Sequence, residues 1–415
     1  MNLKEHISGA VLLALTVIAG ALWLDGSIFF RLLVGLGLGY ALSRASLGFA
    51  GSVNRAYRAG STRLLRHLML LFVLTALATC ALLIQQDVSA VKLWVKPLNV
   101  GLLVGGLMFG FGMAIAGCCA SGVLTYFSSN VLRPAIALLF FGMGVFLGFP
   151  LQATQSWIRD TWVSSASFPN KGVFLPDLFS TDPLGGYLGA MLLTALFASI
   201  VSWFAIRYER SRREQGSFIG VHSEVEQQQG SGIELTQQRF FSRETYHALF
   251  IARWSPITGI AVIVLMFMLL MGVTGSGWGA STPFGLWFGR LLILCGVDAA
   301  DVAAFSHKSV QAFTMPFFSH AVTVQNIGII IGALVSLLLA GRFASGFSRL
   351  PLSAMEVALL AVAGLSMGFG TRFANGCNVG ALFTPIANFS LSGWVFLLVM
   401  ITGGVLGNML RKRLL

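Results

Sequence analysis

Charged residues are scarce in this chain of 415 residues. They make up only 10% of it, whereas soluble domains carry about 25%. So few charges cannot cover a water-facing surface of this size, and 56% of the residues are hydrophobic. The mean hydropathy of +0.81 points the same way. These values exclude an ordinary soluble protein and predict that lipid surrounds most of the chain.

Patterns typical of metal, nucleotide or disulfide chemistry are missing. The five cysteines, an odd number, are Cys80, Cys118, Cys119, Cys295 and Cys377. Most of them lie in apolar runs, which disfavours a disulfide scaffold. No CxxC pair or Cys/His spacing suits zinc, and no Walker motif predicts ATP binding. We therefore expect no metal, no cofactor and no enzymatic activity.

Acidic residues are the rarer charge, with 15 Asp and Glu against 27 Lys and Arg, for a net charge of +12. In a soluble protein this excess would suggest nucleic-acid binding. Here the basic residues gather in short loops between apolar runs, and no basic patch is interleaved with aromatic residues. The pattern is the topology signal of a membrane protein and argues against nucleic acid as a partner.

Apolar runs of about 17–25 residues are long enough to cross a bilayer. We expect full or near-full spans at 7–24, 29–44, 67–86, 99–117, 133–150, 184–207, 255–272, 321–340, 354–374 and 391–410. The first run lacks a small-residue cleavage site, so it is predicted to be a retained helix. Shorter apolar runs are predicted to be re-entrant half-helices or interfacial segments, at 119–129, 284–294 and 377–389.

Arginine-rich loops set the expected orientation. By the positive-inside rule the loop at 44–66, the stretch after residue 207 and the C-terminal Arg411-Lys412-Arg413 are cytoplasmic. Both termini are then cytoplasmic, in a multi-pass protein of a bacterial inner membrane. The polar segment 208–253 is predicted to be a flexible cytoplasmic linker. It separates a first membrane half, 1–207, from a second, 254–415.

The two halves share a glycine-rich motif. Segments 106–122 and 364–380 align at a single offset of 258 residues, with eight identities in 17 columns. The loop charges give the two copies opposite directions, a pattern typical of transporters with inverted repeats. We therefore predict an all-α polytopic membrane protein with an inverted pseudo-two-fold repeat. It should contain re-entrant half-helices and about 9–10 transmembrane helices.

Each copy of the motif is predicted to break a helix at a Gly-Cys step. A break cannot face lipid, because unpaired backbone groups there cost several kcal/mol each. Two inverted copies would bring the breaks together near the midplane, with amide-rich helix starts that favour an anion. Cys119 and Cys377 stand at the breaks, where a thiol can donate to a soft acceptor such as sulfur.

Two further residues near the breaks are site candidates. Cys118 lies beside Cys119, although it replaces the glycine of the second copy and could be a small filler. Arg372 is a cation inside an apolar run, where charges are functional candidates by default. The alternative for Arg372 is that its side chain snorkels to the membrane interface.

The paired Gly-Phe-Gly…Gly-Cys stretches at 112–119 and 370–377 resemble the YeeE/YedE family of bacterial membrane proteins. The stretch 372–378, which ends in Asn378, is similar to the YedE-like branch. The resemblance implies an hourglass-like inverted repeat that takes up thiosulfate or a related small sulfur anion. It makes Cys119 and Cys377 the central relay thiols, which pass the substrate through S–H···S hydrogen bonds without chemistry. Expected partners are the substrate, the lipid bilayer and a small cytoplasmic sulfur-carrier protein.

One position departs from the family pattern. The family has a third cysteine in an early motif, and Gly48 occupies that position here. The chain could therefore use two thiols, or carry another sulfur or selenium species. Two other hypotheses stay open: a membrane thiol–disulfide redox protein that uses Cys118 and Cys119, and a scaffold for another membrane complex. The redox hypothesis requires a partner site and a CxxC pair that the sequence does not show.

Overall fold

The computed structural model describes residues 3–84, 91–117, 132–229, 243–346 and 352–414. Within these ranges the regular structure is helical, apart from two isolated β-bridges, so the prediction of an all-α protein is confirmed. Nine stretches of the described chain are long and apolar enough to cross a membrane. A tenth apolar helix, α5 (Val100–Ala116), has 17 residues.

The remaining long helices are α1 (Leu3–Trp23), α2 (Gly26–Arg44), α4 (Arg63–Leu83), α7 (Leu132–Thr154), α9 (Tyr187–Glu214), α12 (Pro256–Thr274), α16 (Ala321–Leu339), α18 (Ala354–Phe373) and α20 (Leu391–Leu414). The short helices are α3 (Phe49–Ala59), α8 (Ser156–Arg159), η2 (Leu175–Phe179), α10 (His222–Gln229), α11 (Arg243–Tyr246), η5 (His247–Ile251), α13 (Thr282–Leu294), α14 (Ala299–Ser306), α15 (Val310–Thr314), η6 (Phe317–Ser319), α17 (Phe343–Gly346), η7 (Asn378–Phe383) and α19 (Thr384–Ala387).

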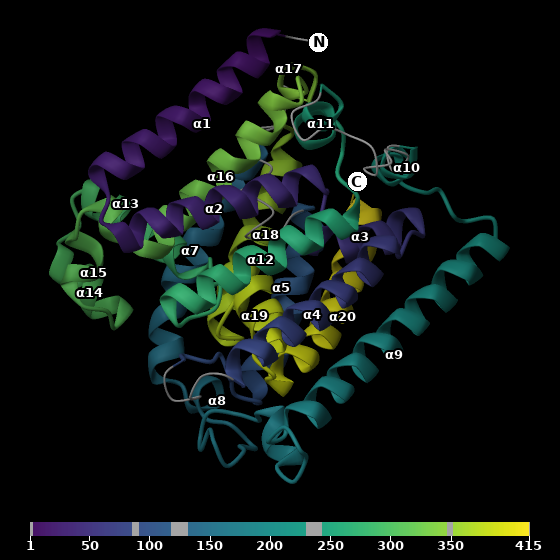
Figure 1. Ribbon diagram of the computed structural model, residues 1–415. Helices are drawn as coiled ribbons and strands as arrows, with labels where there is room; N and C mark the ends of the chain where they lie inside the picture. The colour runs from purple at the N-terminus through teal and green to yellow at the C-terminus, as the bar shows by residue number, and fades with distance from the viewer. Residues whose placement is uncertain (1–2, 85–90, 118–131, 230–242, 347–351, 415) are drawn as a thin grey trace.

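Four helices, α5, α7, α18 and α20, pack together at the centre of the molecule (Figure 1). Helices α5 and α18 run antiparallel, because Gly101 lies near Phe373 while Gly112 lies near Ala363. Helix α20 runs parallel to α5, and α7 runs parallel to α18. The glycines let these backbones approach closely, which is how helices associate in a membrane, where the hydrophobic effect does not hold them together.

The central contacts repeat at the offset of the sequence motif. A methyl group added at Gly112 would lie 2.4 Å from the carbonyl oxygen of Ala363, and one at Gly370 would lie 2.7 Å from that of Gly105. Each of these pairs maps onto the other by 258 residues. Ser366 donates to the carbonyl of Met108 at 2.7 Å, and this pair is itself 258 residues apart. The reciprocity is consistent with the predicted two-fold relation.

The outer helices surround this centre. Helix α2 packs against α16 and α12, and α4 packs against α9 and α12. Helices α1 and α9 run along the outside of the molecule (Figure 1), and large apolar side chains such as Leu22 and Phe204 are exposed on them. These exposed faces are suited to contact with lipid acyl chains.

Both described ends of the chain lie on one face of the molecule, together with α10 and α17 (Figure 1). Near the N-terminus, Glu5 accepts hydrogen bonds from the backbone of Phe343 and Ala344. Near the C-terminus, Asn408 donates to Asn54 of α3. We call this side the linker face, because it carries the segment that joins the two halves.

The short apolar runs take different forms. The run at 377–389 forms η7 and α19 and does not span. The run at 284–294 lies in α13, beside α7, and 119–129 falls outside the described residues. The segment expected to be a flexible linker differs in its described part, where α9 continues to Glu214 and α10 is docked against the membrane half.

Gly110 offers a test of the central packing. A Cβ atom at this position would lie 2.1 Å from the carbonyl oxygen of Met400, so Gly110→Ala should force α5 and α20 apart. We expect a destabilisation of about 1–3 kcal/mol, the usual cost of overpacking, seen as a lower melting temperature in detergent. Gly272→Ala is the control, since its Cβ would meet only Leu82 at 3.7 Å. Equal melting temperatures for the two variants would contradict the packing.

Candidate functional site

Helix α18 is broken just before Cys377. The helix ends at Phe373, and Asn375 then adopts the left-handed conformation at φ +56°, which asparagine tolerates better than most residues. Gly376 donates from its backbone to the carbonyl of Thr371 at 2.7 Å. A Cβ on Gly376 would lie 2.4 Å from the carbonyl carbon of Gly380. The turn therefore requires a glycine directly before the cysteine.

The segment that follows the break returns into the protein. All residues from Cys377 to Ser390 are buried, and Cys377 is only 1% exposed. The ring of Phe383 lies among the rings of Phe49, Phe72, Phe267 and Trp278. The irregular backbone thus faces protein and not lipid, as the cost of unpaired backbone groups requires.

A glycine-rich stretch at 274–279 lets other segments approach this buried turn. A Cβ on Gly277 would lie 2.3 Å from Thr384, and one on Gly279 would lie 2.4 Å from Trp94. The extended chain around Trp94 pairs with the same stretch, since Lys92 donates to the carbonyl of Gly275 at 2.8 Å. Three segments that are distant in sequence therefore meet beside the break in α18.

These segments enclose a cavity of about 460 Å³ on the side opposite the linker face. Its described lining consists of Arg31, Trp94, Lys96, Gln152, Ser276, Gly277, Gly279, Ala280, Ser281, Thr282, Pro283, Lys308, His320, Val322, Arg372, Asn375, Gly376 and Gly380. Five of these side chains are basic or histidine, and none is acidic. Such a one-signed, partly buried cavity focuses its field on anions.

Arg372 is the most deeply buried cation of the cavity, with 4% of its surface exposed. Its guanidinium donates to Ser281 Oγ at 2.7 Å, to Thr371 Oγ1 at 3.2 Å, and to Thr282 and Gln152 at 3.4 and 3.5 Å. All these acceptors are neutral, and no carboxylate pairs with Arg372 in the described part of the chain. A buried charge is costly without a counter-charge, so an anion in the cavity would stabilise this arrangement.

Gln152 links Arg372 to the turn before Cys377. Its side-chain oxygen accepts from Arg372, and its amide nitrogen donates to Asn375 Oδ1 at 2.6 Å. The cation and the left-handed turn are therefore held by the same amide side chain. A change in the position of Arg372 would be transmitted directly to the backbone beside Cys377.

Two lysines extend the cationic surface. The Lys96 ammonium lies 4.8 Å from the Trp94 ring centre, and the Lys308 ammonium lies 5.0 Å from the ring of Phe149. Burial, together with repulsion from Arg372 and Lys92, lowers the pKa of Lys96 to about 8. Burial and then Arg372 also lower the pKa of Lys308. Burial is the main cause of both pKa shifts, and the neighbouring cations add to it.

The structure places some of the predicted site residues together and leaves others apart. Arg372 lines the cavity, and Cys377 lies between two further lining residues, Gly376 and Gly380. Asn378 is buried beside them, and its amide donates to the sulfur of Met113 at 3.3 Å. Cys118 and Cys119 lie outside the described residues.

Gly48 lies at the linker face and not in the cavity. It precedes α3 with an ordinary φ of −117°, and a Cβ added there would meet no atom within 4 Å. Its neighbour Phe49 packs against Phe383 of the re-entrant segment, with ring centres 6.1 Å apart. The position of the family's third cysteine therefore adjoins the buried turn from the other side and has room for a side chain.

Lys96 and Gln152 are cavity residues that sequence reasoning missed. Lys96 lies between two apolar runs and resembles an ordinary loop lysine. Gln152 lies near the end of α7, where a polar residue usually marks the membrane interface. Arg372 lies in a stretch with few other charges, and a cation inside a membrane needs polar partners. Isolated polar residues near the ends of other apolar runs were therefore candidates for the same site.

A multi-pass helical protein whose broken helix ends in a buried, cation-lined cavity has the construction of a membrane transport protein. The comparisons agree, because the chain belongs to the Sulphur transport family, which it matches over residues 44–406. This match confirms the family resemblance noted from the motifs, and it confirms a transporter and not an enzyme.

Individual relatives carry the same assignment. The chain is 27% identical to the thiosulfate transporter TsuA of Spirochaeta thermophila over 390 residues, which cover 91% of this chain and 96% of that protein. It is 22% identical to the Escherichia coli thiosulfate transporter TsuA, over 91% of this chain and 92% of the relative. It is also 29% identical to the probable transporter YedE of Escherichia coli over 161 residues, 39% of each chain.

The open space at Gly48 leads to a direct test. Gly48→Cys should change the free energy of unfolding by no more than about 0.5 kcal/mol, because the new side chain meets no atom and φ is ordinary. Gly376→Cys is the contrasting variant, since its Cβ would collide with the backbone of Gly380. Melting temperatures in detergent check this, and a large loss for Gly48→Cys would show that the site is closed.

Proposed function

We propose that the chain is a bacterial inner-membrane permease that takes up thiosulfate, or a closely related small sulfur dianion. The two TsuA relatives that align over nearly their whole length are named thiosulfate transporters, which supports this substrate. The observation that carries the proposal is the cation-lined cavity, with no acidic residue in its described lining, that ends at the break before Cys377. A dianion with a soft terminal sulfur matches both features.

The cations and the thiol would act in sequence. Lys96, Lys308 and Arg372 draw the dianion into the cavity through their uncompensated charge. Arg372 exchanges long hydrogen bonds with neutral oxygens for a charge-assisted contact with the substrate. Cys377 then donates its S–H to the terminal sulfur of thiosulfate, and Cys119 is the second donor along the path. No covalent bond to the substrate forms or breaks.

The other predicted residues have supporting roles in this proposal. Asn378 and Cys118 border the two relay cysteines, and Gly48 marks the far end of the path. The linker face is the cytoplasmic side, because its arginine-rich loops follow the positive-inside rule. Both termini then lie in the cytoplasm. A small cytoplasmic sulfur-carrier protein would receive the substrate at this face.

The direct test of the substrate is uptake into proteoliposomes. Radiolabelled thiosulfate should accumulate, with competition from unlabelled thiosulfate and little from sulfate, which has no soft terminal sulfur. Sulfite, selenite and tetrathionate complete the competition series. Strong competition by selenite with no uptake of thiosulfate would assign the path to a selenium species instead.

Cysteine variants test the relay. Cys377→Ala and Cys119→Ala should each reduce thiosulfate uptake about tenfold or more, since a hydrogen bond to a charged group is worth about 1.5–3 kcal/mol. Cys295→Ala is the matched control, because Cys295 is exposed at the end of α13. Wild-type uptake by both relay variants would sink the relay. Thiols that become resistant to alkylation during turnover would favour the redox alternative.

The low pKa of Lys96 predicts a pH dependence. Lys96 is charged below about 8 and neutral above it, so thiosulfate uptake should fall as the external pH rises through about 8. Lys96→Arg should keep its charge and move this fall to higher pH. Lys171→Arg, in an exposed loop, should behave like the wild type. An unshifted fall in Lys96→Arg would assign the pH effect to another group.

A further inference from the structure

A second group of cations lies at the linker face, far from the cavity. It surrounds the loop at 44–48 and consists of Arg44, Arg55, Arg63, Arg253 and Arg342, which we call the arginine cluster. Helix α2 connects the two ends, with Arg31 at the cavity and Arg44 in the cluster, about 20 Å apart at 1.5 Å per residue. The cluster is therefore at the opposite end of the molecule.

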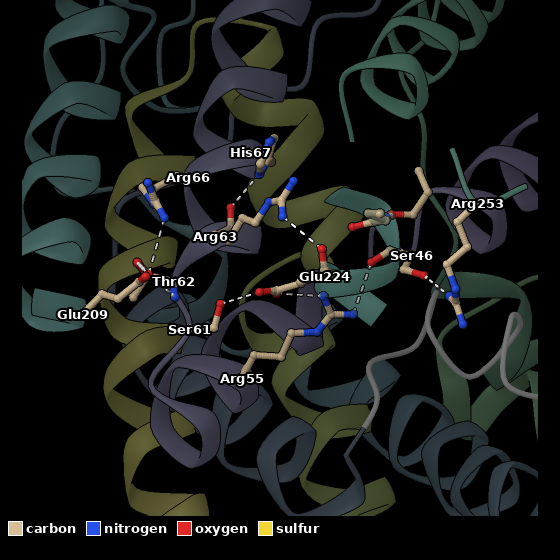
Figure 2. A network of polar contacts seen from close by, with 12 residues as sticks. Ser46, Arg55, Ser61, Thr62, Arg63, Arg66, His67, Glu209, Glu224 and Arg253 are labelled. Carbon is tan, nitrogen blue, oxygen red and sulfur yellow. Dashed lines mark hydrogen bonds and ion pairs between the residues drawn. The ribbon is translucent and has the colours of Figure 1, made fainter. Parts of the chain in front are cut away.

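Helix α10 of the linker covers this cluster, and Glu224 is its central contact (Figure 2). Glu224 pairs with Arg55 at 3.2 Å and accepts from Ser61 Oγ at 2.5 Å. Its backbone carbonyl accepts from Arg63 at 3.1 Å. Only 8% of Glu224 is exposed, so this carboxylate is inserted into the cluster and does not lie on its surface.

A second carboxylate of α10 engages the other side of the cluster. Glu226 forms an ion pair with Arg253 and another with Arg342 at 3.6 Å. Gln227 donates to the carbonyl of Ala45 at 2.7 Å and to that of Trp254 at 3.3 Å. Helix α10 therefore sits directly on the backbone of the loop that carries Gly48.

Arg44 has no carboxylate partner among the described residues, and its guanidinium lies 5.9 Å from the ring centre of Tyr40. It is 4% exposed, its Nε and Nη2 have no hydrogen-bond partner, and its Nη1 makes one long bond of 3.5 Å to the carbonyl of Ser336. Arg253 and Arg342 repel it further. A buried guanidinium with two unsatisfied N–H groups can donate hydrogen bonds to an anion.

The docking of α10 is polar throughout. Its buried described side chains are Glu224 and Gln227, whereas Val225 is 47% exposed. The ion pairs of Glu226 with Arg253 and Arg342 are partly solvated, and pairs of this kind are individually weak and are screened by salt. The preceding chain is anchored by bonds from Ile219 and Gly220 to the carbonyl of Ala59, and Gly220 has a positive φ of 76°. These features suit a reversible contact pivoting at Gly220.

We propose that the arginine cluster is a second binding site for the transported dianion, and that α10 is an acidic latch that occupies the cluster until substrate displaces it. Glu224 and Glu226 stand in for the two charges of the dianion. The loop that the cluster surrounds leads into Phe49, whose ring centre lies 6.1 Å from that of Phe383, so the cluster is close to the re-entrant segment on its linker-face side. This inference rests on the proposed function, since the latch is defined by the anion that opens it.

Charge-neutral variants test the latch in the full-length protein. Glu224→Gln/Glu226→Gln should raise the initial rate of thiosulfate uptake at least twofold and weaken its dependence on ionic strength. Glu214→Gln/Glu244→Gln, exposed carboxylates in the same linker, should match the wild type. Reduced uptake by the latch variant at a wild-type melting temperature would overturn the proposal, because it would show that α10 supports transport.

Hydrogen exchange in the unmodified protein provides a test that does not depend on the stability of a variant. Saturating thiosulfate should raise the exchange rate of the α10 amides severalfold, and Arg44→Gln should abolish that increase. Unchanged α10 exchange in a protein that still transports thiosulfate would overturn the latch alone. Absence of thiosulfate uptake by the wild type would instead overturn the proposed function.

Discussion

The requirement that no unpaired backbone group faces lipid governs the architecture of this protein. Helix α18 stops at Phe373, and the turn and short helix that follow would expose unpaired backbone groups if they faced acyl chains. Helices α4 and α20 pack against this segment, and Met113 of α5 and Phe267 of α12 contact it, while backbone bonds at Gly376 close the turn. Every feature of the candidate site, from the glycine-rich stretch at 274–279 to the cavity itself, follows from sheltering that break.

The burial of this turn also determines the electrostatic character of the cavity beside it. A buried turn with polar backbone needs polar neighbours, and these are Gln152, Ser281 and Thr282, whose oxygens also receive Arg372. None of these oxygens carries a formal charge, so the guanidinium is solvated but not neutralised. At the linker face the cations are instead met by carboxylates from α10. In the described chain, the cations at one end of the molecule have only neutral partners, whereas most of those at the other end are paired with carboxylates.

Much of this arrangement could be predicted from sequence. Apolar run lengths located the long helices, and the repeat at 106–122 and 364–380 located the helix break at Cys377. Arg372 stood out because a cation within an apolar run is rare. These signals are local or nearly local in sequence. They depend on hydrophobicity and glycine, which report directly on the bilayer and on close backbone contact.

The remainder depended on contacts between distant segments. Lys96 joins the cavity because the extended chain before it is held by bonds from Lys92 to Gly275 and from Trp94 to Asn388. Neither partner is evident from the sequence around Lys96. The polar composition of α10 is typical of a solvated linker. Glu224 is nevertheless buried, because it contacts Arg55 and Ser61, which lie 169 and 163 residues away in sequence. Composition therefore predicts that a polar segment is solvated only where the fold brings no distant polar partner into contact with it.

The vacant volume beside Gly48 has a consequence for how this family can diversify. A glycine codon can become a cysteine codon by one base change, and the backbone here accepts either residue without rearrangement. The fold therefore does not restrict position 48 to a residue without a thiol. Related chains can gain or lose a thiol at this position while every helix stays in place.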